Sequence, residues 1–250
     1  MGFEETRHVE ARGFPPAHLI AGLASIVVLT GCVTTSPIVA DDPHVFLPSF
    51  RVGISLDDGK PASPEPGTGR AIEFGFVKAK GSGSQTLAAG QSPIVLNNTT
   101  FAAPQQIRND FDLDYADISF RWRKFFGERS LGLEVRGGIG RAALGLTASS
   151  PVQQASEHFG TYGPQGGVAL VWRMRPGISL HLRASGFVSD SDTGINDLAR
   201  YEIFVAQSLG DHLAVRAGYA RWNISGAGGA DQSDFRLTLS GPVLDLGLDF

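Results

Sequence analysis

Cysteine, lysine and charged residues in general are scarce in this chain of 250 residues. The single cysteine, Cys32, excludes an internal disulfide and a cysteine-based zinc site. Charged residues make up 18% of the chain, below the usual share of about 25%. The net charge of −4 arises from acidic and basic residues that are interspersed along the chain. Because no basic patch is present, the sequence predicts no nucleic-acid partner.

Long apolar runs are also missing, and glycine is abundant instead. One apolar run of twelve residues, 19–30, is too short to span a bilayer as a helix. The 32 glycines disfavour an all-helical protein, because glycine weakens helices. The hydrophobic share of 42% is still large enough for a folded core.

The N-terminal apolar run has the length of a signal-peptide core. It ends at Leu29-Thr30-Gly31-Cys32, which resembles the bacterial lipobox. The resemblance implies that residues 1–31 are a lipoprotein signal peptide and that Cys32 is acylated, with palmitate as one marker. The alternative is an ordinary cleavage region with an idle thiol. Residues 32–48 contain three prolines and no steady period, so we predict a tether there.

From residue 70 onward the dominant hydrophobic period is two, which is typical of strands with one apolar and one polar face. Two further segments, 50–56 and 93–101, would raise the number of strands from eight to ten, although the second could instead form a small hairpin at Asn97-Asn98. The pattern favours eight strands, at 70–79, 111–125, 130–146, 165–175, 177–188, 198–209, 212–223 and 234–250.

The connections between these strands alternate between short and long. Short turns at one end and long loops at the other are typical of bacterial outer-membrane barrels. An even number of strands places both chain ends on the turn side, which is periplasmic in such barrels. The expected short turns are 127–129, 175–177 and 210–211, and the expected long loops are 80–110, 147–164, 189–197 and 224–233.

The polar faces of the strands carry mainly arginine and carboxylates. Of the 21 basic residues only four are lysine, and arginine suits buried, bidentate ion pairs. Small residues such as Gly138 and Gly218 share these faces. We therefore expect the polar faces to line a closed lumen and the apolar faces to meet lipid. The expected lumen network comprises Glu73, Asp117, Arg121, Glu134, Arg136, Arg173, His181, Arg183, Glu202 and Arg216.

The C-terminal strand ends in an aromatic residue, Phe250, behind alternating leucines. This resembles the signal that barrel-assembly machinery reads in outer-membrane proteins. The apolar phase of the strand shifts across Gly241-Pro242, which predicts a bulge there. Further aromatics are expected in two girdles, Phe120, Trp122 and Trp172 with Phe250 near the turns, and Tyr201 and Tyr219 near the loops.

Together these patterns resemble the small opacity-type and OmpA-like outer-membrane barrels. The resemblance implies an all-β fold with an antiparallel up-and-down transmembrane barrel at 49–250. It implies residence in the outer membrane, lipid-anchored at Cys32. The implied partners are outer-membrane lipid, the barrel-assembly machinery through the strand ending at Phe250, and an unidentified surface ligand.

No catalytic motif or metal-ligand pattern stands out, so we predict neither an enzymatic activity nor a cofactor. His181 and His212 both lack the His-x-Ser pattern that lipid A deacylases of this architecture carry. The favoured function is a structural or surface-interaction barrel with outer loops as its working surface. Two alternatives stay open: a lipid-anchored periplasmic lipocalin-like binding barrel with an apolar interior, and a lipid-modifying outer-membrane enzyme.

Overall fold

The computed structural model describes residues 35–42, 44–57, 68–126, 130–190, 192–229 and 231–250. They belong to the unit Val33–Phe250, one of two compact units in the chain. All regular structure in these residues is β-strand, so the predicted all-β class is confirmed. None of the described segments is a helix long and apolar enough to cross a membrane. The expected signal peptide and Cys32 lie outside the described residues.

Each predicted strand is found; all are longer than the sequence predicted except β9 and β12, which are slightly shorter. Their bounds are β1 Ile38–Asp42, β2 Leu47–Ser55, β3 Gly69–Leu87, β4 Ile94–Leu96, β5 Thr99–Phe101, β6 Gln105–Phe126, β7 Leu131–Ser149, β8 Gln154–Arg175, β9 Ile178–Val188, β10 Gly194–Ser208, β11 Leu213–Ala227 and β12 Phe235–Asp249.

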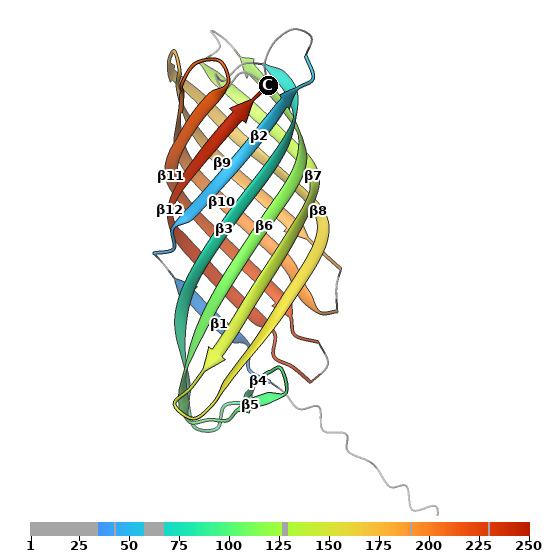
Figure 1. Ribbon diagram of the computed structural model, residues 1–250, viewed down its shortest axis with the longest axis vertical. Coiled ribbons are helices and arrows are strands. Elements are labelled where there is room, and N and C mark those ends of the chain that lie inside the picture. Colours follow the sequence, from blue (N-terminus) through green and yellow to red (C-terminus); the bar gives the residue numbers. More distant parts are fainter. Residues whose placement is uncertain (1–34, 43, 58–67, 127–129, 191, 230) are drawn as a thin grey trace, which may run out of the picture. The chain divides into compact units, whose positions relative to one another are not determined.

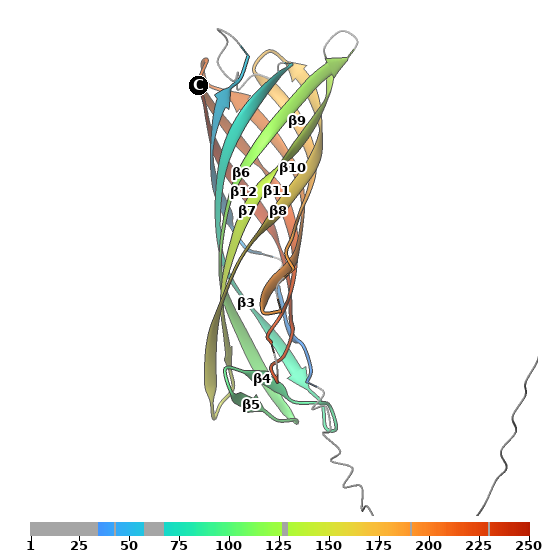
Figure 2. The same cartoon turned by 90° about the vertical axis from the view of Figure 1, so that its right-hand side faces the viewer.

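The large sheet closes on itself through its first and last strands. Antiparallel pairings lead from β2 through β3 and β6 to β12, and β12 then pairs with β2 in parallel, Val243 opposite Leu47. β1 pairs with the earlier part of β12, Ile38 opposite Phe235, so β1 and β2 share one place in the ring. The described strands therefore form a ring with nine strand positions, one of which β1 and β2 occupy in succession. Figures 1 and 2 show this ring from two sides.

The predicted number of eight strands is wrong, because β2 adds a ninth place to the ring. The sheet does contain ten strands, but the tenth is β1. Residues 93–101 form the separate hairpin β4–β5, which turns at Asn97 and Asn98 with φ of 45° and 60°. An odd number of places makes the first and last strands parallel. Ile38 and Phe250 therefore lie at opposite ends of the ring, contrary to the expectation that both chain ends share a side.

Part of the expected tether is strand. Residues 38–42 and 47–48 lie in β1 and β2, within the segment 32–48 that the prolines had marked as irregular. The reason is burial, because Ile38 and Leu47 are fully enclosed by the sheet. Side chains from neighbouring strands also hold β1, since Asn109 Nδ2 donates to the carbonyl oxygen of Val39 at 2.8 Å.

As predicted, one end of the ring carries short turns, but the bounds of the loops at the other end differ from the prediction. The turn end carries Phe250 and tight turns at Gly177 and Gly210, with φ of 75° and 82°; the predicted turn 127–129 lies outside the described residues. At the opposite end, which we call the loop end, residues 150–153 alone join β7 to β8. The predicted loops 80–110 and 147–164 are mostly strand, because β3, β6, β7 and β8 extend there to 19 or 22 residues (Figure 2).

The two faces of β6 exchange polarity along the strand. Near the loop end, Phe111 and Leu113 are buried, while Asp112 and Asp114 face outward. Beyond Ala116 the order is reversed. There the inward, buried residues are Asp117, Ser119, Arg121 and Arg123, and the outward, exposed residues are Ile118, Phe120 and Trp122.

Strand β12 reverses in the same way, which corrects the predicted bulge. Its register with β11 runs without a shift from Phe235 to Leu248. Leu237 and Leu239 are buried inside, whereas Leu244 and Leu246 are exposed outside. The prediction of a bulge is wrong because the apolar residues change face while the backbone continues regularly.

The reversal divides the described unit into two zones. In the loop-end zone the interior is apolar, and the β4–β5 hairpin covers it with the buried residues Ile94, Leu96 and Phe101. In the turn-end zone the interior is charged and the outer surface is apolar. We call that outer surface the apolar band; it includes Phe50, Ile54, Phe74, Phe76, Ile118, Phe120, Trp122, Leu131, Val135, Ile139, Tyr162, Val168, Leu170, Trp172, Leu182, Tyr201, Ile203, Tyr219, Leu244 and Leu246.

An aromatic layer separates the two interiors. The ring of Tyr115 meets Phe187 and Trp222 edge to face, with centroid distances of 6.3 and 5.6 Å. On the charged side, the guanidinium of Arg200 lies 4.7 Å from the Trp222 ring centroid. The aromatic rings therefore present an apolar face to one zone and a cation-binding face to the other.

The parallel closure predicts a specific crosslink. Phe50 and Leu246 are outward partners across β2 and β12, so cysteines at both positions should form a disulfide on mild oxidation in a Cys32→Ala background. Pro242 lies on the same strand about 13 Å from Leu246, so the Phe50→Cys/Pro242→Cys pair should stay reduced. Mass analysis of proteolytic fragments measures both. Equal oxidation of the two pairs, or none in the first, contradicts the closure.

Candidate functional site

The charged interior of the turn-end zone gathers the residues that the sequence placed in the lumen. Arg173 is partly exposed, and its guanidinium lies 4.9 Å from the ring centroid of Phe125. The remaining nine are all buried: Glu73, Asp117, Arg121, Glu134, Arg136, His181, Arg183, Glu202 and Arg216.

Glu73 on β3 is the acceptor for three arginines. Arg121 Nη1 donates to Glu73 Oε1 at 2.7 Å, and Arg51 Nη1 lies 3.3 Å from Oε2. Arg136 Nη2, from β7, lies 2.9 Å from the same Oε2. Because these guanidiniums come from three other strands, one carboxylate ties β2, β6 and β7 to β3.

Glu134 on β7 repeats this arrangement. Arg136 Nη2 donates to Glu134 Oε1 at 2.6 Å, and Arg123 Nε donates to Oε2 at 2.9 Å. Arg183 Nη2 lies 3.7 Å from Glu134 Oε1, and Arg183 Nη1 lies 3.3 Å from Glu202 Oε2. Glu73, Arg136, Glu134, Arg183 and Glu202 thus alternate in sign, and we call this series the ion-pair chain. It crosses the interior from β3 to β10.

A second group of charges lies where the ring closes. Arg216 on β11 pairs with Asp245 on β12, and both side chains are buried. Ser49 Oγ on β2 donates to Asp245 Oδ2 at 2.7 Å. The carboxylate of Asp245 therefore links the last two strands to β2, across the parallel pairing.

Hydrogen bonds connect the charged interior to the aromatic layer. Gln165 Nε2 donates to Asp117 Oδ2 at 2.8 Å, and Tyr115 donates its hydroxyl to Gln165 Oε1 at 2.7 Å. The tyrosine thus turns its hydroxyl toward the charges while its ring packs on Phe187. A polar edge of this kind satisfies the groups at the boundary of the two interiors.

Inward glycines make room for the charged side chains. A Cβ at Gly247 would lie 3.0 Å from two nitrogens of the Arg216 guanidinium, and one at Gly75 would collide with Asp117. Gly138 and Gly218 have another reason, because a Cβ there would strike the backbone of the neighbouring strand.

His181 is held as a structural member of this interior. Its Nε2 lies 2.8 Å from Ser179 Oγ, and its ring stacks on Phe204 with a centroid distance of 4.7 Å. Ser179 and His181 are 1% and 3% exposed. His181 Nδ1 has no hydrogen-bond partner within the part of the chain that the structure describes, so no carboxylate orients the ring as a serine hydrolase requires.

Arg51 and Arg123 are members of the interior that the sequence analysis did not place on a polar face. Arg51 has the opposite phase to Phe50 and Ile54, and Arg123 has the same phase as Arg121. The first was overlooked because β2 was not counted in the favoured strand set. Arg123 lies near the end of its strand, but its phase already matched the inward face. The sequence therefore contained the signal that places Arg123 in the interior.

At the loop-end edge of the apolar band, the outer surface changes from apolar to charged between two successive outward residues of a strand. On β3, Phe76 is followed outward by Lys78 and Lys80. Lys78 Nζ lies 3.0 Å from Asp114 Oδ1, and Lys80 Nζ lies 2.6 Å from Asp112 Oδ2. The hydrogen bond with Asp114, together with the charge of Asp112, raises the pKa of Lys78 above its ordinary value.

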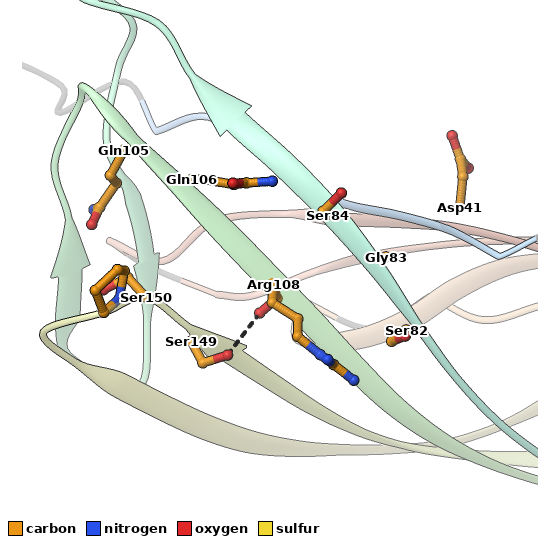
Figure 3. Close-up of a pocket in the computed structure, with 10 residues that line it drawn as sticks. Asp41, Ser82, Gly83, Ser84, Gln105, Gln106, Arg108, Ser149 and Ser150 are labelled. Atoms are coloured by element: carbon orange, nitrogen blue, oxygen red, sulfur yellow. Dashed lines mark hydrogen bonds between the residues drawn. The ribbon is translucent and has the colours of Figure 1, made fainter.

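The loop-end zone also has a polar groove of about 770 Å³ on its outer face (Figure 3). Hydroxyls and amides line it, and Ser149 Oγ donates to the carbonyl oxygen of Arg108 at 3.3 Å. Arg108 Nε donates to Asp110 at 3.0 Å. The groove is open to solvent and suits a polar partner. Its lining comprises Asp41, Ser82, Gly83, Ser84, Gln105, Gln106, Arg108, Ser149, Ser150 and Pro151.

Comparisons with protein-family models, with curated proteins and with solved structures find no match to this chain. Among the described residues, no three histidine, cysteine or acidic side chains come together as a metal site would require. The geometry of the two zones therefore carries the functional argument by itself.

Breaking the ion-pair chain should destabilise the protein strongly. Glu134→Ala leaves three buried guanidiniums without this carboxylate, which should cost about 3–5 kcal/mol of unfolding free energy. Asp112→Ala removes an exposed partner of Lys80 and should cost about 1 kcal/mol or less. Urea unfolding of both variants in detergent micelles measures the difference. Equal unfolding midpoints would show that the interior pairs contribute little to stability.

Proposed function

We propose that the protein is an outer-membrane β-barrel whose turn-end zone spans the bilayer and whose loop-end zone stands outside it. The observation that carries the proposal is the exchange of polarity along single strands such as β6 and β12. In water, an exposed apolar surface of this extent is unfavourable by about 25 cal/mol per Å². In a bilayer the same surface is favourable, and the charged interior is shielded from lipid.

The height of the apolar band supports this proposal. On β7 the outward residues from Leu131 to Ile139 are small or apolar, and Arg141 follows. This span of nine positions agrees with the about 9–11 residues that a tilted strand needs to cross a bilayer. Both edges carry exposed aromatics, Trp172 and Phe250 toward the turn end and Tyr162 and Tyr219 toward the loop end. Aromatics at both edges are typical of membrane barrels.

The interior favours a structural or surface-interaction role over transport. The ion-pair chain crosses the lumen from β3 to β10, so the turn-end zone is filled by paired side chains. The loop-end zone then supplies the working surface, with the polar groove around Arg108 as the place where an unidentified surface ligand would bind. A large steady conductance in planar bilayers would oppose this assignment.

The two alternative functions gain less support. A periplasmic binding barrel needs an apolar interior and a polar exterior, and only the loop-end zone has both. There the interior is filled by side chains and covered by β4–β5. A lipid-modifying enzyme would need an accessible nucleophile, whereas the pair Ser179 and His181 is buried.

Assembly by barrel-inserting machinery, through the last strand, fits the way in which the ring closes. The backbone of Phe250 pairs with β2, since its N–H donates to the carbonyl of Gly53 at 2.8 Å and its carbonyl accepts from Ser55 at 2.7 Å. The side chain of Phe250 is 58% exposed. The strand that carries the assembly signal is therefore also the strand that seals the ring.

The position of β1 changes the leaflet expected for a lipid on Cys32. Five residues separate Cys32 from Ile38, and six extended steps span at most about 22 Å. Because Ile38 lies at the loop end, an acylated Cys32 would reach the leaflet on that side. Radiolabelled palmitate should enter the protein and be lost in Cys32→Ala. Equal labelling of both forms would remove the lipid anchor from the account.

Loop tagging in a Gram-negative host tests the orientation. Val152 at the loop end is 85% exposed, so an epitope inserted beside it should bind antibody on intact cells. An epitope at Gly210, in a turn at the opposite end, should bind only after the outer membrane is breached. If both tags stay hidden until lysis, a periplasmic binding barrel replaces the proposed function.

A further inference from the structure

We propose that the apolar band contains a binding groove for the acyl chain of a phosphate-bearing, anionic lipid, with Arg141 holding the headgroup phosphate. The proposal rests on the proposed membrane function and names a lipid site within it. The site would favour a phosphate-bearing, negatively charged lipid in the leaflet at the loop end.

The groove has a volume of about 770 Å³ and lies across the outer faces of β3, β6, β7 and β8. Its depth comes from Ala116, whose outward neighbours in register are Phe76 and Arg141. The small alanine side chain leaves a channel between larger neighbours. The walls are Ile72, Phe74, Ile118, Phe120, Ile139 and Tyr162. Apart from Arg141, the outward side chains are apolar or aromatic, as an acyl chain requires.

Arg141 lies where the groove meets the loop-end edge of the apolar band. Its guanidinium is 5.5 Å from the ring centroid of Tyr162. Within the described residues, no ion pair joins Arg141 to a carboxylate, whereas Lys78 and Lys80 at the same edge are paired with Asp114 and Asp112. A guanidinium held by an aromatic ring keeps its charge available, and its planar fork matches the oxygens of a phosphate.

A second groove repeats this arrangement further around the ring, over β7 to β11. It has a volume of about 560 Å³, with Leu170, Leu182 and Ile203 among its apolar residues. Arg221 lies at its margin, opposite Tyr201 in register. Its Nε donates to Asn223 Oδ1 at 3.3 Å. Because an amide oxygen is uncharged, this contact leaves the guanidinium charge unneutralised. The repetition indicates that the loop-end edge is complementary to anionic headgroups.

Native mass spectrometry of the full-length protein tests the site by counting retained lipids. The detergent-solubilised protein is exposed to phosphatidylglycerol or to phosphatidylcholine of the same chain length. Arg141→Gln should lower the retention of phosphatidylglycerol about fivefold, the effect expected for one basic residue at a membrane surface. It should lower the retention of phosphatidylcholine less, because the choline cation offsets the charge of the phosphate. Ala116→Trp fills the groove and should lower the retention of both lipids.

Arg175→Gln is the matched control, because Arg175 is an exposed arginine outside both grooves. It should retain phosphatidylglycerol as the parent does. If Arg141→Gln and Arg175→Gln behave alike, or if inorganic phosphate alone displaces the lipid, the groove is not a lipid site. Resistance to carbonate extraction from vesicles is measured in parallel. If these variants resist carbonate extraction as the parent does, the proposed membrane function stands. If the parent itself is extracted, that function is overturned instead.

Discussion

A charged interior inside an apolar exterior is stable only if its charges neutralise one another, and the ion-pair chain meets this condition. Glu73 and Glu134 each receive guanidiniums from several strands, and Arg136 joins the two carboxylates. The pairs add little net stability by themselves, because burying them carries a large desolvation cost. Their consequence is specificity: each strand must stand in the register that brings its charge to its partner. The parallel closure of the ring depends on the same rule, through Asp245 and Ser49.

The second constraint is that one set of strands carries two opposite distributions of polarity. In the loop-end zone the apolar side chains face inward, as in a protein surrounded by water, and Leu113 and Leu144 are enclosed. In the turn-end zone they face outward. The backbone continues regularly through the change, as the register of β11 with β12 shows. The aromatic layer around Tyr115 keeps the two interiors apart, because it offers rings to one and hydroxyl or cation contacts to the other.

Much of the fold could be predicted from the sequence, because apolar and polar residues that alternate with a period of two reveal the two faces of a strand. That period located the eight strands that follow residue 68 in the sheet and separated inward Glu134 from outward Val135. The period of two was misleading at Gly241-Pro242. The shift of phase there marks the exchange of polarity, but a bulge would produce the same pattern in the sequence. The period also failed for β1, because the prolines on either side, Pro37 and Pro43, suggested a tether although Ile38 is buried. The outer grooves depend on cross-strand register, which no single strand reveals.

The most direct test of the account is a scan of outward positions along β6 in phospholipid vesicles. Single spin labels replace Asp112, Asp114, Ile118 and Phe120 in a Cys32→Ala background, so that no interior contact is disturbed. The account predicts that labels at 112 and 114 meet a water-soluble relaxation agent, whereas labels at 118 and 120 meet oxygen dissolved in lipid. The change should fall at Ala116, where the two faces exchange polarity. Four labels with the same access to the water-soluble agent would contradict the membrane-spanning role of the turn-end zone.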